Sequence, residues 1–185
     1  MTPRLVALIL LACAGAAEAQ TPPASSPARF NPAAPENRQV LPTFSYATLE
    51  AVLAQVGARF ERRGTAERPV LIATFANNRR AAILFGSCER AGAACKAISI
   101  QAVWNRPPGL APERLAAAIQ SFNQRYAFAR AFITTDGRPA LQRYLTADYG
   151  IIRGNVAVNL LVFANQVDRF VAEVLRPAPA APAAR

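Results

Sequence analysis

Two cysteines bracket a short polar stretch between two apolar runs, and this arrangement constrains the fold more than any other feature. Cys88 and Cys95 close the segment CERAGAAC, and the run that follows, KAISIQAVW, alternates apolar and polar residues. Alternation with period two is typical of a strand that buries one of its faces. The segment therefore predicts a β-hairpin whose tip carries both cysteines and whose second strand ends at Trp104.

Three chemistries use such a pair: a zinc site, a redox-active dithiol or a structural disulfide. A structural zinc ion takes four Cys or His ligands, and this chain has three cysteines and no histidine. Redox dithiols usually have the spacing Cys-x-x-Cys, whereas six residues separate Cys88 from Cys95. A pair of cysteines in an exported chain favours a disulfide. The N-terminal pattern described next predicts export, so we expect a Cys88–Cys95 bond that stabilises the fold by roughly 2–3 kcal/mol.

The first twenty residues have the pattern of an export signal. An arginine is followed by an apolar run over residues 5–14 and by an A-x-A cleavage motif at residues 17–19. The run is shorter than the ~20 residues that span a bilayer, so no transmembrane segment is predicted. We predict cleavage between Ala19 and Gln20 and a periplasmic or secreted location. A lipoprotein anchored at Cys13 is the alternative, because Leu-Leu-Ala-Cys loosely resembles a lipobox.

Segments rich in Pro and Ala flank one candidate domain. Residues 20–42 and residues 176–185 have no apolar periodicity, so we predict a disordered leader and a disordered tail. The remaining stretch, residues 43–175, is long enough for a single hydrophobic core.

Within this domain, the pattern predicts an α+β fold in which helices pack on an antiparallel sheet. Ser45 is a plausible N-cap for the first helix, and Asp136-Gly137 is typical of a hairpin turn. The expected order is α-β-β-β-α-β-β-α. The helices are expected over residues 45–57, 112–126 and 155–175, and the strands over 70–75, 82–85, 96–104, 127–134 and 141–147.

The chain lacks the usual marks of catalysis. It has no histidine, no Walker or G-x-G-x-x-G loop, no G-x-S-x-G elbow and no paired acidic motif. We therefore predict no enzyme activity, no cofactor and no metal site. The net charge of +10 comes from arginines scattered singly or in pairs, which predicts a solvated basic surface and no nucleic-acid partner.

Polar residues gather where the second helix gives way to a strand. Asn123, Arg125 and Arg130 are the candidate binding residues. Helix capping and surface solvation are the simpler interpretation of the same three side chains.

The passage AILFGSCERAGAACKAISIQAVW, followed by IQSFNQRYAFARAFITTDGRPALQRYLTAD, resembles the YbjN-like family of bacterial sensory transduction regulators. The resemblance spans residues 43–175 and rests on the cysteine-bracketed hairpin, Phe122-Asn123, the run from Phe128 to Ala131 and the final helix. Members often have Trp-Asn in place of Phe122-Asn123, and Gly in place of Ala129.

The resemblance implies a fold similar to that of type III secretion chaperones, which are dimeric and bind extended segments of partner proteins. It supplies no catalytic residues. We predict a non-enzymatic exported binding or chaperone-like module with a regulatory or sensory role and a protein or peptide partner. Two alternative functions stay open: a small-molecule sensor or enzyme with an Arg-lined pocket, and a basic protein of the envelope surface. A homodimer is a possible assembly.

Overall fold

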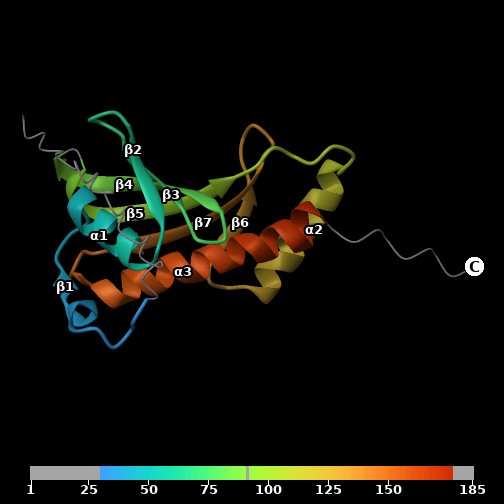
Figure 1. The fold of residues 1–185 in the computed structure, drawn as a ribbon. Helices are drawn as coiled ribbons and strands as arrows, with labels where there is room; N and C mark the ends of the chain where they lie inside the picture. The colour runs from blue at the N-terminus through green and yellow to red at the C-terminus, as the bar shows by residue number, and fades with distance from the viewer. Residues whose placement is uncertain (1–29, 91, 177–185) are drawn as a thin grey trace, which may run out of the picture.

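The computed structural model describes residues 30–90 and 92–176, in which a six-stranded antiparallel sheet packs against helices (Figure 1). The strands follow the order β2-β3-β4-β5-β7-β6 across the sheet. They are β2 (Arg59–Gly64), β3 (Pro69–Thr74), β4 (Arg80–Arg90), β5 (Ala93–Val103), β6 (Arg130–Ile133) and β7 (Pro139–Thr146). The helices are α1 (Tyr46–Gln55), α2 (Pro112–Arg125) and α3 (Arg153–Phe170), and α3 continues into a π-helical turn, Val171–Leu175. The predicted α+β class is confirmed.

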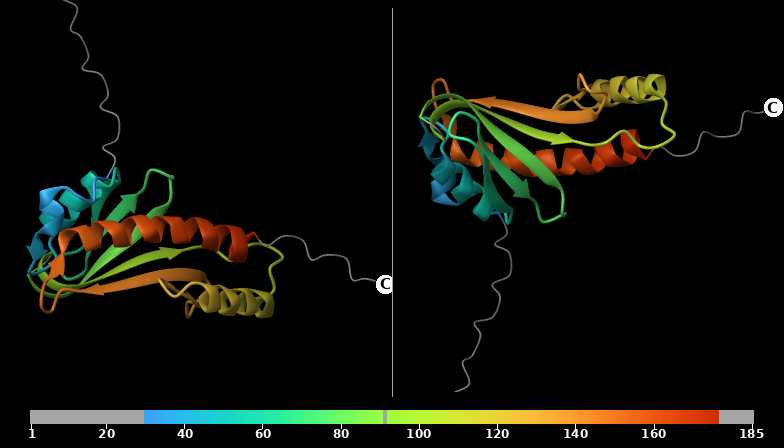
Figure 2. Two further views of the ribbon diagram at one scale, coloured as in Figure 1. Left: turned by 90° about the horizontal axis from the view of Figure 1, so that it is seen from below. Right: turned by 90° about the horizontal axis from the view of Figure 1, so that it is seen from above.

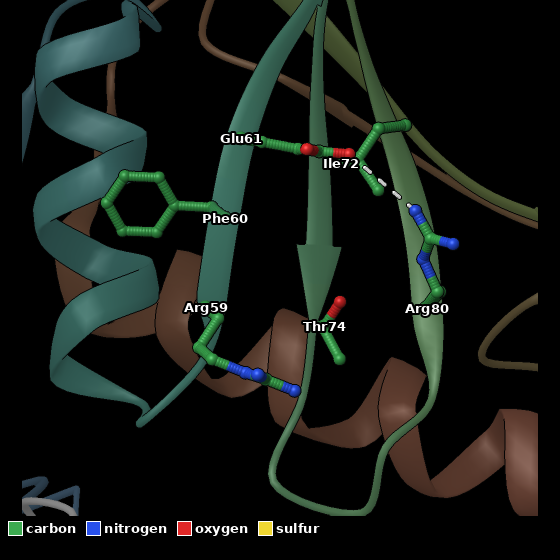
Figure 3. Close-up of a pocket in the computed structure, with 6 residues that line it drawn as sticks. All are labelled: Arg59, Phe60, Glu61, Ile72, Thr74 and Arg80. Carbon is green, nitrogen blue, oxygen red and sulfur yellow. Dashed lines mark ion pairs between the residues drawn. The ribbon is translucent and has the colours of Figure 1, made fainter.

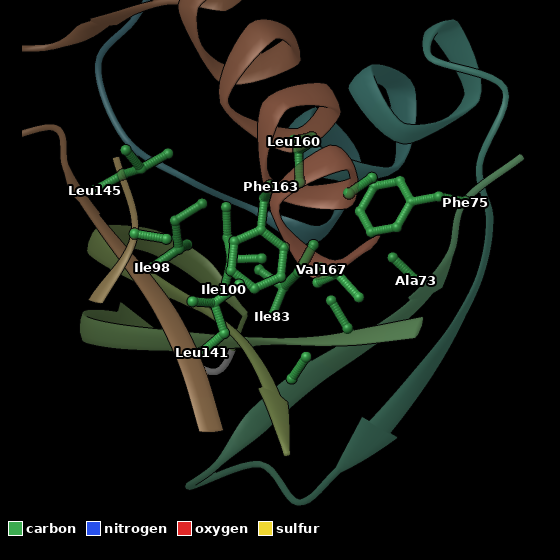
Figure 4. Close-up of a cluster of buried hydrophobic side chains, with 14 of the residues drawn as sticks. Ala73, Phe75, Ile83, Ile98, Ile100, Leu141, Leu145, Leu160, Phe163 and Val167 are labelled. Atoms are coloured by element: carbon green, nitrogen blue, oxygen red, sulfur yellow. The ribbon is translucent and has the colours of Figure 1, made fainter. Parts of the chain in front are cut away.

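The core lies between α3 and one face of the sheet. Leu160, Phe163 and Val167 recur at helical spacing on α3, and all three are buried. Figure 4 shows these side chains pointing toward the buried residues of the central strands, which include Ile83, Ile98, Ile100 and Leu141. Figure 2 shows α3 running along this face, with α2 near its C-terminal end. No helix in the described part of the chain is long and apolar enough to cross a membrane.

Helix α1 begins where the sequence predicts, at an N-cap formed by Ser45. The Ser45 Oγ accepts a hydrogen bond from the Thr48 N–H at 3.1 Å, and the Ser45 N–H donates to the Thr48 Oγ1 at 2.9 Å. This reciprocal pair satisfies backbone donors that the first turn leaves free. The helix buries Leu49, Val52 and Leu53 in the core.

The β4–β5 hairpin is longer than predicted, and the cysteines lie inside it rather than at its tip. Cys88 pairs directly with Cys95, and the pairing continues to Arg90 opposite Ala93. The Sγ atoms lie 2.13 Å apart, at disulfide distance, and the Cα atoms 3.8 Å apart. Both backbone groups of Cys95 bond to Phe44, so they face away from β4. The cysteines therefore form a non-hydrogen-bonded pair, the closer of the two antiparallel pair types.

The structure differs from the predicted disordered leader at residues 30–42. A 3₁₀ turn, Pro35–Arg38, precedes a two-residue strand, β1 (Val40–Leu41), which pairs with β8 (Ile151–Ile152). Asn37 is buried; its Nδ2 donates to the Asn31 carbonyl at 2.8 Å and its Oδ1 accepts from Gln55 at 2.9 Å. The segment also places Leu41 in the core and packs Phe30 against it. Two isolated apolar contacts and a set of polar ones leave no apolar periodicity in a sequence.

The export signal, its cleavage site, Cys13, residues 20–29 of the leader and residues 177–185 of the tail lie outside the described residues. Within the described residues, strand β2 was not predicted from the sequence. All six β2 residues are exposed, so RFERRG has no apolar alternation to mark it as a strand.

Candidate functional site

The sheet has a second face, which is turned away from α3 and which carries the candidate site. Strand β3 buries Leu71 and Ala73 against the helices and directs Ile72 and Thr74 to this opposite face, because successive side chains of a strand alternate. Figure 3 looks onto this face, with α3 behind the strands. We call it the open face.

Two adjoining cavities lie on the open face. The first has a volume of about 250 Å³ and the second about 380 Å³, and both are lined by Ile72 and Arg80. The first extends to Arg59, Phe60, Glu61 and Thr74 (Figure 3), and the second to Ala82, Gln101 and Val103. Together they form a shallow depression from β2 to β5, which we call the open-face groove.

The β2 end of the groove is charged. The Glu61 carboxylate lies 3.0 Å from the Arg63 guanidinium and 3.7 Å from that of Arg80. The hydrogen bond from Arg63 holds the pKa of Glu61 below its usual value, so this carboxylate stays ionised. Arg59 makes no ion pair within residues 30–90 and 92–176. The groove therefore presents uncompensated positive charge to solvent.

Neutral polar and apolar groups form the rest of the open face. The Ser99 Oγ accepts hydrogen bonds from Gln101 at 2.9 Å and from Gln142 at 2.7 Å, so a row of amides crosses β5 and β7. The small side chain of Ala82 lines the groove without filling it, and Val103, which is 40% exposed, lies at its side. This surface combines apolar contact area with amide donors and acceptors.

The chemistry of the groove suits binding. Among the described residues that line it, Thr74 has the only hydroxyl group and Glu61 the only carboxylate. Nucleophilic catalysis needs a nucleophile beside a general base, and an ionised carboxylate that is paired with two arginines is a weak base. Across the described part of the chain, no three His, Cys, Asp or Glu side chains gather in a way that could hold a metal ion.

Two of the three sequence-predicted residues are engaged elsewhere in the fold. The Asn123 Nδ2 donates to the Ala131 carbonyl and its Oδ1 accepts from the Ala131 N–H, both at 2.9 Å. Arg125 forms an ion pair of 2.8 Å with Glu173 in the π-helical turn. Asn123 thus joins α2 to β6, and Arg125 joins α2 to the end of α3.

Arg130 is the predicted residue that reaches the open face. It is the residue opposite Gln142 on β7, and its guanidinium lies 5.8 Å from the centre of the Phe132 ring. The structure therefore does not bring Asn123, Arg125 and Arg130 together into one pocket.

Sequence reasoning missed the residues that line the groove, above all Arg59, Glu61 and Arg80. The available signal was the alternation of charge in RFERRG, where every second residue from Arg59 to Arg63 is charged. That pattern is typical of a solvent-facing strand at a sheet edge.

A comparison with protein-family models matches residues 45–176 to YbjN, described as "Putative bacterial sensory transduction regulator". The match covers nearly the whole described domain. The chain belongs to the YbjN family. No curated protein matches the sequence at a significant level. The YbjN match includes α1, the six-stranded sheet, α2 and α3, so the open-face groove lies within the family domain.

Proposed function

We propose that this YbjN protein is an exported, non-catalytic binding module that holds an acidic, extended segment of a partner protein in the open-face groove. The observation that carries the proposal is the groove itself, an open depression lined by apolar and polar side chains together with two exposed arginines, Arg59 and Arg80. A regulatory role, as the family description suggests, would follow from holding and releasing the partner.

The shape of the groove suits an extended chain. It runs across β2, β3, β4 and β5, so it crosses three strand spacings. At about 4.8 Å per spacing this is roughly 14 Å, which an extended peptide covers with about four residues. A strand-like segment could set alternate side chains on the apolar floor while the others face solvent.

The charge of the protein favours an acidic segment. The chain has a net charge of +10, which attracts anionic partners over distance. At short range, the Arg80 side chain is 66% exposed, and its ion-pair partner Glu61 also pairs with Arg63. Export is supported by the N-terminal sequence pattern and by the cysteine pair at disulfide distance.

Fluorescence anisotropy with a defined probe tests the proposal. The probe is a labelled octapeptide of alternating Glu and Val, compared with an octapeptide of alternating Lys and Val. We expect the acidic probe to bind more tightly, and we expect Arg80→Glu and Ala82→Trp each to weaken its binding at least tenfold. Ala82→Trp fills the floor of the groove without changing the charge.

The matched control is Arg114→Glu, which makes the same charge change at an exposed position of α2. If Arg80→Glu and Arg114→Glu have equal effects, the peptide senses only the net charge, and the proposed site is wrong. Unchanged binding by Ala82→Trp would also contradict it.

A further inference from the structure

The outer edge of β2 has backbone groups that face away from the sheet. Gly64 pairs with Pro69, and Thr65 donates to the Arg68 carbonyl. Proline has no N–H, so Gly64 and Pro69 form a non-hydrogen-bonded pair. Alternation along the regular register then makes every second pair non-hydrogen-bonded, and the N–H and C=O groups of Phe60, Arg62 and Gly64 point outward. Within the described residues these six groups accept and donate no hydrogen bond.

The opposite end of the sheet is covered in part. On β6, the outward N–H and C=O of Ala131 are both taken by the side-chain amide of Asn123, which bonds as a neighbouring strand would. Within residues 30–90 and 92–176 no side chain bonds to the outward groups of β2 in this way, and each of its six residues is exposed. An exposed strand edge is a template for pairing with another chain.

The charge pattern of β2 selects its partner strand. On the open face, Arg59, Glu61 and Arg63 follow one another as plus, minus, plus. A uniformly acidic strand would place a carboxylate opposite Glu61. A strand with alternating charge fits better, and β2 itself has this pattern.

We propose that two copies of this chain pair edge to edge through antiparallel β2 strands, with Glu61 of each copy opposite an arginine of the other. In the register that places Arg62 opposite Arg62, each Glu61 faces the other copy's Arg63. Phe60, Arg62 and Gly64 then all pair, which gives about six backbone hydrogen bonds.

The central arginines do not oppose this register. Arg62 points to the other face of the sheet, where its Nε and Nη2 donate to the two carboxylate oxygens of Glu50 on α1, at 2.5 and 2.9 Å. Each Arg62 is thus neutralised within its own copy. Moving the register by two residues, so that Phe60 lies opposite Arg62, would place Glu61 opposite Glu61, and like charges directly opposite each other are destabilising.

Pairing at β2 would extend the proposed binding surface. The first cavity of the open-face groove is lined by Arg59, Phe60 and Glu61, so it ends at this edge. In the dimer, the grooves of the two copies would lie side by side on one continuous sheet. The pairing itself needs no ligand, so it can be tested apart from the proposed function.

Sedimentation velocity over a range of concentrations tests the proposal with the full mature chain. The contact is small, so we expect a reversible dimer with a Kd on the order of micromolar. Glu61→Arg makes this face of β2 fully positive, and Arg59→Glu/Arg63→Glu makes it fully negative. We expect each variant alone to be monomeric at concentrations where the wild type is dimeric, and an equimolar mixture to form heterodimers.

The mixture keeps the experiment independent of the exact register, because every register then pairs opposite charges. Arg114→Glu, on α2, should dimerise like the wild type. A wild type that is monomeric at 200 μM (roughly a hundredfold above the expected Kd), a mixture that stays monomeric, or a Glu61→Arg protein that still dimerises would overturn the proposal.

Hydrogen exchange supplies a second measurement that needs no variant. Raising the concentration of the wild type through its dimerisation range should slow exchange at the Phe60 and Arg62 amides at least tenfold. Unchanged exchange at both amides would contradict pairing at this edge. Slowing only after addition of the acidic octapeptide would show that the edge takes a partner strand instead of a second copy, and would also overturn the proposal.

Discussion

Breaking the Cys88–Cys95 link should cost a predictable part of the stability of the fold. The two cysteines are seven positions apart, so the bond closes a loop of about eight residues. In the chain-entropy model, a loop of this length contributes about 2.5 kcal/mol. For a domain of this size, that corresponds to a fall in Tm of roughly 8–12 °C.

The structure indicates why the loss should be of this size and no larger. After reduction the hairpin keeps its backbone pairing, and the two bonds between Cys95 and Phe44, of 2.8 and 2.9 Å, stay in place. Cys88 is only partly buried, so Cys88→Ser removes the bond without creating a large cavity.

The assay is thermal unfolding of the wild type and of Cys88→Ser, each with and without a phosphine reductant. We expect the reductant to lower the Tm of the wild type to that of Cys88→Ser, and to leave the variant unchanged. Thiol titration of the unfolded mature wild type should find no free thiol. Two free thiols, or a wild-type Tm that does not respond to reduction, would refute the reasoning.

Three further predictions concern side-chain contacts within the domain. Asn123→Ala removes both hydrogen bonds to Ala131, so the free energy of unfolding in urea should fall by about 1–3 kcal/mol; a fall below 0.5 kcal/mol would contradict the structural role. Phe163→Ala should cost about 3–5 kcal/mol in the same assay, because the ring is fully buried between α3 and the sheet. The hydrogen bond from Arg79 lowers the pKa of Asp168, so this pair stabilises the fold above the unfolded pKa of about 4 and the effect is lost as the pH falls through the lowered folded pKa. Both side chains are partly exposed, so the effect should be below about 1 kcal/mol, and the Tm difference between wild type and Asp168→Asn should shrink from pH 6 to pH 2.

The elements that bury apolar side chains could be predicted from the sequence. Helix α3 follows from the spacing of Leu160, Phe163 and Val167, and β5 follows from the alternation around Ile98 and Ile100. In both elements one face packs on the core, so apolar residues recur in the sequence with the period of the helix or the strand.

The elements held by polar contacts could not be predicted in this way. Strand β2 is exposed, and the segment around Asn37 is held by side-chain hydrogen bonds. The partner of Asn123, eight residues further along the chain, depends on how α2 docks beside β6. A polar residue in a sequence does not reveal whether its partner is solvent, a ligand or the backbone. For this reason the binding residues were predicted near α2, whereas the groove lies across β2–β5.

The amide of Asn123 also bears on the solubility of the protein. A sheet with two bare edges can add copies at both ends and grow into a fibre, whereas one with a covered edge stops when the other edge is filled. In the fold described here, Asn123 occupies the outward groups of Ala131 on β6, whereas no side chain covers the outward groups of β2. By occupying Ala131, this one carboxamide makes β6 a shorter template for pairing than β2, which would favour an assembly that ends at two molecules over one that continues into an aggregate.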